Sequence, residues 1–189
     1  MSGAPPTKAA LRSHLLARRD LVSLALQENF ALQQRDHALE ALTFKGVVAG
    51  YRSIRREADP SPLMQVLYDR KIALALPCLL DDKKMMFRQW TPGDPLRLNA
   101  LNIEEPLPQA PEVMPDMLIM PLVAFDLSGQ RLGYGKGYYD RLFANPAYER
   151  ARRIGYAYEF QKLERLPSEP HDATLDYVAT EAAFYRFLD

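Results

Sequence analysis

The sequence predicts an α/β fold: a three-layer α/β/α sandwich with a mostly parallel sheet, formed as a single domain by residues 1–189. Three observations support this prediction. Runs such as 46–51 and 117–120 are apolar at consecutive positions, as strands buried on both faces are. These runs alternate with longer segments of helical spacing. The length of 189 residues suffices for one full-sized core.

The first helix is expected near the N-terminus. Thr7 is a suitable N-cap, and leucines at helical spacing continue to about Leu26. This helix also carries four basic residues, Lys8, Arg12, Arg18 and Arg19. From the spacing alone, we expect most of them on its solvated face.

Two further helices are expected in the first half of the chain. One covers about 31–44 and is closed by Gly46, because glycine commonly follows the last turn of a helix. The other covers about 63–70. It follows Ser61 and Pro62, a cap and a proline at the first helical position, where proline is tolerated.

The apolar runs are expected to form strands between these helices. Their ranges are 46–51, 72–76, 85–90, 117–120, 153–156 and 177–179. Pro77 should end the second of them, because proline cannot donate to a strand ladder. Frequent prolines between 92 and 115 predict a long ordered connection without a helix.

The remaining elements follow the fourth of these strands. A turn is expected at 126–129, and a helix should start at 137–138 and end near 145–146. Thr180 is a suitable cap for a final helix at the C-terminus.

The composition excludes several classes of function. Basic and acidic residues are equal at 24 each, which argues against an extended nucleic-acid surface. Cys78 is the only cysteine, so no intramolecular disulfide or thiolate zinc site can form, and its apolar neighbours indicate a buried thiol. His14, His37 and His171 lie far apart in the sequence. A metal site would therefore be built from oxygen ligands and would suit Mg²⁺.

The chain shows no membrane or export signal. Its N-terminus lacks the apolar core of a signal peptide. The longest apolar stretch, 117–125, is too short to span a bilayer and contains Pro121. We expect a cytoplasmic protein without membrane partners, and its size makes a monomer the default expectation.

The most informative segment runs from Arg131 to Arg141, where three glycines alternate with Tyr134, Lys136 and Tyr138. Glycine lets backbone N–H groups approach a ligand closely, and neighbouring cations favour a phosphate. The spacing matches neither the Walker A motif nor the dinucleotide fingerprint. A tight turn whose tyrosines pack into the core explains the glycines equally well.

Other segments of the chain extend this pattern. They are Lys8-Ala-Ala-Leu-Arg12, residues 51–60 with Glu57 inside them, Glu105-Pro106, residues 115–126, and Pro170-His171-Asp172-x-x-x-Asp176. With the glycine-rich string at 129–141, they resemble in sequence and order the motifs of the 5-formyltetrahydrofolate cyclo-ligase family, also called 5,10-methenyltetrahydrofolate synthetases. The resemblance covers most of the chain, and the glycine-rich string is its most specific part.

The resemblance implies an ATP-dependent enzyme of one-carbon metabolism. Such a ligase converts 5-formyltetrahydrofolate to 5,10-methenyltetrahydrofolate and releases ADP and phosphate, with Mg²⁺ as cofactor. The formyl oxygen would attack the γ-phosphate of ATP, and N10 would then close the ring. Phosphoryl transfer depends mainly on positioning and charge, so it needs cations, backbone donors and a metal clamp.

The resemblance also implies roles for particular residues. Contacts with ATP are implied for Lys8, Arg12, Arg131, Gly133, Tyr134, Gly135, Lys136, Gly137, Tyr138 and Tyr139. The folate would contact Glu57, Tyr134 and Tyr138. The Mg²⁺ ligands would be Asp140 and Asp172. The catalytic residues would be Lys136, Arg131 and Tyr138, and loss of Lys136 should damage the chemistry most.

Each assignment has a structural alternative. Asp140 fits a carboxylate in the first turn of a helix, and Asp172 a turn residue that bonds its own backbone. Glu57 fits a solvated charge beside two arginines. For the whole chain, the rival functions are a non-catalytic folate-binding relative with the same fold and an unrelated ATP-binding enzyme.

Overall fold

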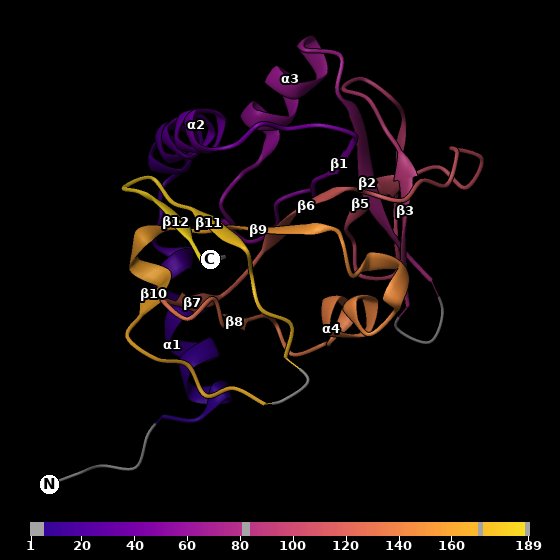
Figure 1. Ribbon diagram of the computed structural model, residues 1–189. Helices are drawn as coiled ribbons and strands as arrows, with labels where there is room; N and C mark the ends of the chain where they lie inside the picture. The colour runs from indigo at the N-terminus through magenta and orange to yellow at the C-terminus, as the bar shows by residue number, and fades with distance from the viewer. Residues whose placement is uncertain (1–5, 81–83, 170–171, 188–189) are drawn as a thin grey trace, which may run out of the picture.

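Figure 1 shows the computed structural model, which describes residues 6–80, 84–169 and 172–187. The α-helices in these ranges are α1 (Lys8–Asp20), α2 (Leu24–Ala41), α3 (Ser61–Asp69) and α4 (Tyr138–Phe143). The strands are β1 (Val47–Ala49), β2 (Ala73–Leu79), β3 (Met85–Gln89), β4 (Leu96–Leu98), β5 (Glu104–Pro106), β6 (Met117–Pro121), β7 (Ala124–Asp126), β8 (Arg131–Leu132), β9 (Arg152–Tyr156), β10 (Lys162–Leu163), β11 (Tyr177–Ala179) and β12 (Phe184–Arg186). Short 3₁₀ helices are η2 (Pro146–Tyr148) and η3 (Glu159–Gln161). Pro170 and His171 of the closing motif lie outside the described residues.

The main sheet has seven strands in the order β12-β11-β9-β6-β1-β2-β3. Neighbours from β11 to β2 pair in parallel, and the edge strands β12 and β3 pair antiparallel. Each apolar run that was predicted as a strand forms one strand of this sheet. The predicted α/β fold with a mostly parallel sheet is therefore confirmed.

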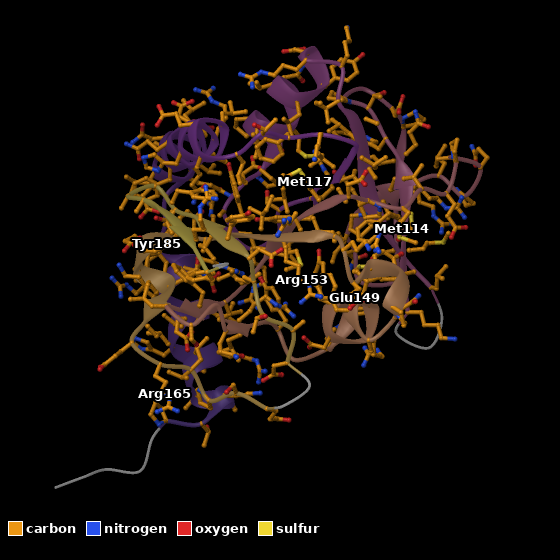
Figure 2. All side chains as sticks on the ribbon, viewed as in Figure 1. Met114, Met117, Glu149, Arg153, Arg165 and Tyr185 are labelled. Carbon is orange, nitrogen blue, oxygen red and sulfur yellow. The ribbon has the colours of Figure 1, made fainter. Side chains whose placement is uncertain are left out.

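Alternation along the central strands divides the core between the two faces of the sheet. Met117 and Ile119 of β6 pack in one apolar cluster with residues of α2 and α3. Leu118 and Met120 pack in a second cluster, with Leu142 of α4. Figure 1 shows α2 and α3 on one side of the sheet and α4 on the other, and Figure 2 shows Met117 on the side of α2 and α3. Helices thus cover both faces.

A smaller sheet with the order β10-β7-β8 supports α1. Leu15 of α1 packs in one cluster with Val123, Ala124 of β7 and Leu132 of β8. The glycine-rich segment follows β8 directly, so this packing joins α1 to the base of that segment. The sequence analysis predicted the turn between β7 and β8 but not the strands themselves.

The N-terminal helix ends earlier than predicted. The helix is interrupted between Leu21, the C-cap of α1, and Ser23, the N-cap of α2. The Ser23 hydroxyl accepts the N–H of Leu26 at 3.2 Å, so the serine begins a new helix. Leucines at helical spacing continue across the break, and that spacing concealed it.

The prediction that Pro77 ends the second strand was wrong. β2 continues through Pro77. No hydrogen bond to β1 is lost there, because β1 pairs with β2 only as far as Ala75. The connection between 92 and 115 has no helix, as predicted, but it contains β4 and β5, which form a two-stranded sheet.

The predicted final helix is a strand. The Thr180 hydroxyl accepts the N–H of Ala183 at 3.0 Å, and the Thr180 N–H donates to the Ala183 carbonyl at 2.9 Å. These bonds close a tight turn rather than cap a helix. The chain then reverses as β12, with Tyr185 opposite Val178 of β11.

The strand order also fixes where a ligand crevice opens. From β1 the chain passes to β2 on one side, whereas from β6 it passes to β9 on the other side. Connections diverge in this way at a topological switch point, and ligands of open α/β sheets bind there, beyond the carboxyl ends of the strands. In the described residues, no helix has the length and apolarity to cross a bilayer.

The Ser23 cap supplies a test of the helix break. Ser23→Ala removes the acceptor for the Leu26 N–H and should lower the free energy of unfolding by about 1 kcal/mol. Ser23→Asp keeps an acceptor and should unfold at the same urea concentration as the unaltered chain. Urea unfolding followed by circular dichroism measures both. Equal midpoints for the alanine variant and the unaltered chain would show that the cap does not define the break.

Candidate active site

A cavity of about 310 Å³ lies at the switch point. Its walls include Tyr51 beyond β1, Pro77 and Leu79 at the end of β2, and Pro121 at the end of β6. Every residue that the sequence analysis proposed for the site lines this cavity. These residues are Lys8, Arg12, Glu57, Arg131, Gly133, Tyr134, Gly135, Lys136, Gly137, Tyr138, Tyr139, Asp140 and Asp172.

The lining of the cavity divides into two chemically different groups of residues, which are called its charged end and its apolar end. The glycine-rich segment, α1 and Asp172 bring charged groups to one end. The other end is lined mainly by apolar side chains: Ile54, Pro77, Leu79, Met85, Leu101, Ile103 and Pro121. They come from loops and strand ends far apart in the sequence, and no short motif joins them. The cavity therefore suits an elongated ligand with an anionic part and a flat, apolar part.

Two glycines of the segment have backbone conformations that side chains disfavour. Gly135 has φ +89°, and Gly137, the N-cap of α4, has φ +68°. The Arg12 guanidinium lies against the first of them: a Cβ at Gly135 would be 3.3 Å from Cζ of Arg12. Arg12 Nε also donates to the Gly133 carbonyl at 2.7 Å. The glycines therefore let the arginine pack directly against the backbone of the segment.

Arg131 is held beneath the segment by a carboxylate. Its side chain is only 5% exposed, and Nη2 donates to Oδ1 of Asp140 at 2.8 Å. The guanidinium also lies over the Tyr139 ring, 5.4 Å from its centroid. Among the described residues, Nε of Arg131 is buried without a hydrogen-bond partner. Asp140 lies in the first turn of α4, as its structural alternative requires, and it also faces the cavity.

A second ion pair joins α1 to the closing motif. Nζ of Lys8 donates to Asp172 at 2.7 Å and to Glu169 at 2.9 Å. Burial lowers the pKa of Lys8, but the bonds to Asp172 and Glu169 outweigh it and leave the pKa above its ordinary value. Asp172 also accepts the N–H of Glu169 at 2.8 Å while it contacts the lysine.

Lys136 differs from the other cations because it is exposed, at the rim of the cavity. Tyr138 is half-buried beside it, with the Arg141 guanidinium 5.7 Å from the centroid of its ring. An exposed lysine at the rim can reach a ligand without displacing an internal partner.

Glu57 is buried, so the alternative of a solvated charge is wrong. The side chain of Glu57 is 4% exposed, and its carboxylate accepts the N–H of Ile54 at 2.9 Å and the hydroxyl of Tyr134 at 2.8 Å. Burial raises the pKa of Glu57, while the Ile54 N–H, the Arg19 guanidinium and the Tyr134 hydroxyl each oppose the rise. Its carboxylate therefore lies in the wall of the cavity rather than in bulk solvent.

The sequence analysis missed Arg19. It was expected with the other basic residues of α1 on a mostly solvated face, but it is 1% exposed. Its Nη2 donates to the Tyr134 hydroxyl, and its Nε donates to the Arg55 carbonyl at 3.0 Å. One signal was present in the sequence: Arg19 follows the buried Leu15 by four residues, and this spacing places both on one face of the helix.

The residues present fit Mg²⁺ only with help from a ligand. Asp140 and Asp172 both line the cavity and offer oxygen atoms. In the part of the chain that is described, no three His, Cys, Asp or Glu side chains gather into a protein-only metal site. Mg²⁺ is commonly held by one or two carboxylates together with substrate phosphates and water. Two carboxylates at the charged end match that mode.

The sequence was compared with known protein families and proteins. The model of the 5-formyltetrahydrofolate cyclo-ligase family matches residues 4–181. The 5-formyltetrahydrofolate cyclo-ligase of Escherichia coli K12 is 36% identical over 146 residues, which are 74% of this chain and 80% of that protein. The Haemophilus influenzae cyclo-ligase is 35% identical over 160 residues, 80% of this chain and 86% of that protein.

Solved structures agree with the sequence comparison. The 5,10-methenyltetrahydrofolate synthetase of Aquifex aeolicus superposes with a TM-score of 0.79 at 31% identity, over 96% of this chain and 93% of that one. The synthetase of Mycoplasma pneumoniae gives a TM-score of 0.74 at 26% identity, over 93% of this chain and 99% of that one.

The buried carboxyl of Glu57 predicts a pH-dependent contribution to stability. Because its pKa is raised above 4.5 in the folded chain, its contribution is complete below pH 4.5 and is lost as the pH rises through the raised pKa. Glu57→Gln removes this titration. The stability of the unaltered chain relative to this variant should therefore fall as the pH rises from 4.5, and urea unfolding at several pH values measures it.

Glu149→Gln is the matched control, because Glu149 is exposed and does not line the cavity. This variant should show a much smaller dependence on pH. A stability difference between the unaltered chain and Glu57→Gln that stays constant with pH would contradict the effect of burial on Glu57.

Proposed function

The chain belongs to the 5-formyltetrahydrofolate cyclo-ligase family, and from this premise we propose how it converts 5-formyltetrahydrofolate to 5,10-methenyltetrahydrofolate with release of ADP and phosphate. ATP as co-substrate is implied by the family. The observation that carries the proposal is the cavity itself: it joins a charged, glycine-rich end to an apolar end with a buried carboxylate. An ATP phosphate chain fits the first end and a reduced pterin the second.

In the proposed complex, the charged end holds the phosphates of ATP. Lys8 and Arg12 reach the cavity from α1, and Gly133, Gly135 and Gly137 let backbone N–H groups approach the phosphate oxygens. Tyr134, Tyr138 and Tyr139 border the same space. Phosphate binding by several N–H groups and cations together needs no covalent contribution from the protein.

The chemistry begins with a poor electrophile. The N5-formyl group is an amide, and its oxygen attacks the γ-phosphorus as the bond to ADP breaks. The product is an iminium phosphate whose formyl carbon is activated. N10 adds to that carbon and loses its proton, phosphate leaves, and the five-membered ring closes.

Three residues are proposed to act on the transferring group. Arg131, buried beneath the glycines, and Lys136, at the rim, stabilise negative charge on the phosphoryl oxygens. Tyr138 borders the formyl group and limits where it can lie. Arg131 is preorganised by Asp140 and Tyr139, whereas Lys136 can move with the substrate.

The folate is proposed to occupy the apolar end. Glu57 accepts hydrogen bonds from N–H groups of the pterin, and Tyr134 and Tyr138 shape the space beside it. The apolar wall from Ile54 to Pro121 covers the ring faces. Exclusion of water there protects the activated carbon from hydrolysis before N10 reaches it.

Asp140 and Asp172 are the residues that would hold Mg²⁺. When bound, the ion would neutralise charge on the ATP phosphates. In the structure these carboxylates instead contact Arg131 and Lys8, which are themselves proposed phosphate contacts. We infer that the charged end is balanced internally before ATP arrives, and that the ATP phosphates then replace the carboxylates as partners of Arg131 and Lys8.

The proposal also covers how the chain works as a whole. It acts as one cyclo-ligase domain over residues 1–189, as a monomer in the cytoplasm, with small-molecule substrates and neither nucleic acid nor membrane as partner. The balanced net charge and the size of the chain support this part of the proposal.

One assay tests the function. The purified chain is mixed with 5-formyltetrahydrofolate, ATP and Mg²⁺, and the near-ultraviolet absorbance of the methenyl product is followed. We expect product only when all three are present, with one ADP formed per product. A folded chain that binds 5-formyltetrahydrofolate and forms no product would instead be a non-catalytic relative.

Lys136→Ala should reduce kcat by about 100-fold, because it removes a charge that stabilises the transferring phosphoryl group. Its stability should stay within about 0.5 kcal/mol of the unaltered chain, since Lys136 is exposed. Lys45→Ala, at an exposed lysine that does not line the cavity, is the control and should keep full turnover. Unchanged kcat in Lys136→Ala would remove this lysine from the mechanism.

Asp140→Asn should raise the Mg²⁺ concentration that gives half-maximal rate by about tenfold, equal to about 1.4 kcal/mol of binding free energy. The control is Asp36→Asn, an exposed carboxylate whose ion pair is with Arg35 on α2. Rates over a Mg²⁺ titration at fixed ATP measure the effect. If only the KM for ATP changes and the Mg²⁺ dependence does not, Asp140 holds Arg131 and does not bind the metal.

A further inference from the structure

Arg19 lies just behind the cavity wall. It does not line the cavity, but its contacts Tyr134 and Glu57 do. Its guanidinium donates to the Tyr134 hydroxyl, lies 5.3 Å from the centroid of that ring, and places Nη1 4.0 Å from Oε1 of Glu57. Arg19 is therefore in contact with two of the three residues proposed to face the folate.

Stability alone gives a poor explanation for this arginine. The side chain is 1% exposed, and its Nη1 has no hydrogen-bond partner among the described residues. An apolar side chain of similar volume often replaces a buried ion pair without loss of stability. The reason for a guanidinium at this position must therefore be sought in what it does to its neighbours.

The first effect is on the direction of the Tyr134 hydroxyl. A guanidinium has donors and no acceptor, so the hydroxyl oxygen must accept from Arg19. The single proton of the hydroxyl is then left for Oε1 of Glu57, 2.8 Å away. Arg19 thus fixes which way the Tyr134 proton points.

The second effect is on the turn that carries Glu57. Arg55 and Arg56 occupy the left-handed region, with φ 45° and 57°, which is unfavourable for residues with side chains. Nε of Arg19 donates to the Arg55 carbonyl at 3.0 Å and so holds this turn. This turn directs the Ile54 N–H to Oε2 of Glu57, at a distance of 2.9 Å.

Together these contacts fix both oxygens of Glu57. Oε1 accepts from Tyr134 and Oε2 accepts from Ile54, while a carboxylate has about four acceptor positions in all. We propose that Arg19 is a positioning residue for the folate end of the cavity: it orients the Tyr134 hydroxyl and the 54–57 turn so that Glu57 presents its remaining acceptor positions to the folate. The inference rests on the proposed function, because it takes folate as the ligand of this end.

The test compares Arg19→Met with Arg18→Met. Arg18 is the neighbouring arginine of α1, exposed and stacked over Phe160, and it does not line the cavity. Calorimetry measures binding of 5-formyltetrahydrofolate without ATP, and steady-state kinetics gives a KM for each substrate. Arg19→Met should bind the folate at least about tenfold more weakly, with the KM for ATP within about twofold, and Arg18→Met should match the unaltered chain.

A general loosening of the fold would weaken binding of both substrates equally, whereas a positioning role weakens binding of the folate far more than binding of ATP. Equal losses for ATP and folate, or unchanged folate binding in Arg19→Met, overturn the inference while leaving the proposed function intact. An unaltered chain that neither binds the folate nor forms product overturns both. A chain that binds it without turnover overturns only the ligase reaction, and the binding comparison still decides the role of Arg19.

A double-mutant cycle separates the role of Arg19 from that of Tyr134. Tyr134→Phe removes only the hydroxyl that Arg19 orients. In that background, Arg19→Met should weaken folate binding by a clearly smaller factor than it does alone. Independent, multiplying effects overturn the coupling through the hydroxyl. If Arg19→Met does not fold, Arg19→Lys, which keeps the charge and loses the fork of donors, takes its place with the same expected loss of folate affinity.

Discussion

The chain leaves the neighbouring strands β1 and β6 in opposite directions, and this divergence determines where the cavity and its lining residues lie. These two strands are neighbours, but the chain leaves β1 towards β2 and leaves β6 towards β9. No crossover fills the space beyond their ends, so a cavity opens there. The segment after β1 supplies Glu57, and the segment that follows β6, β7 and β8 supplies the glycine-rich string. Residues from distant parts of the sequence meet because both segments begin at this gap.

The two ends of the cavity are organised by different physics. At the charged end, Lys8 and Arg131 contact Asp172 and Asp140, so the charges of the protein neutralise one another over short distances. At the apolar end, the buried Glu57 is held by directed hydrogen bonds instead. Under the proposed function, a ligand with a charged and a flat apolar part would exchange ion pairs at one end and meet preformed geometry at the other.

The sequence was sufficient for features that depend on local pattern. Consecutive apolar positions located six of the seven strands of the main sheet, and the motif at 129–141 pointed to residues that line the cavity. It was insufficient where tertiary contacts decide. Ser23 starts a new helix although the leucine pattern continues past it. Pro77 is tolerated because β1 ends before it, and Thr180 closes a turn. The burial of Arg19 could not be read from its type, because charged side chains at the end of a helix are usually solvated.

Helix α1 sets a fixed spacing between the two proposed substrate positions. Lys8 and Arg19 are eleven residues apart on one continuous helix, about 16 Å at 1.5 Å per residue, and they contact the charged and the apolar end respectively. One inserted residue between them would turn one contact by about 100° relative to the other. The length of this helix is therefore constrained more strongly than its composition, and insertions or deletions in related chains should fall outside it.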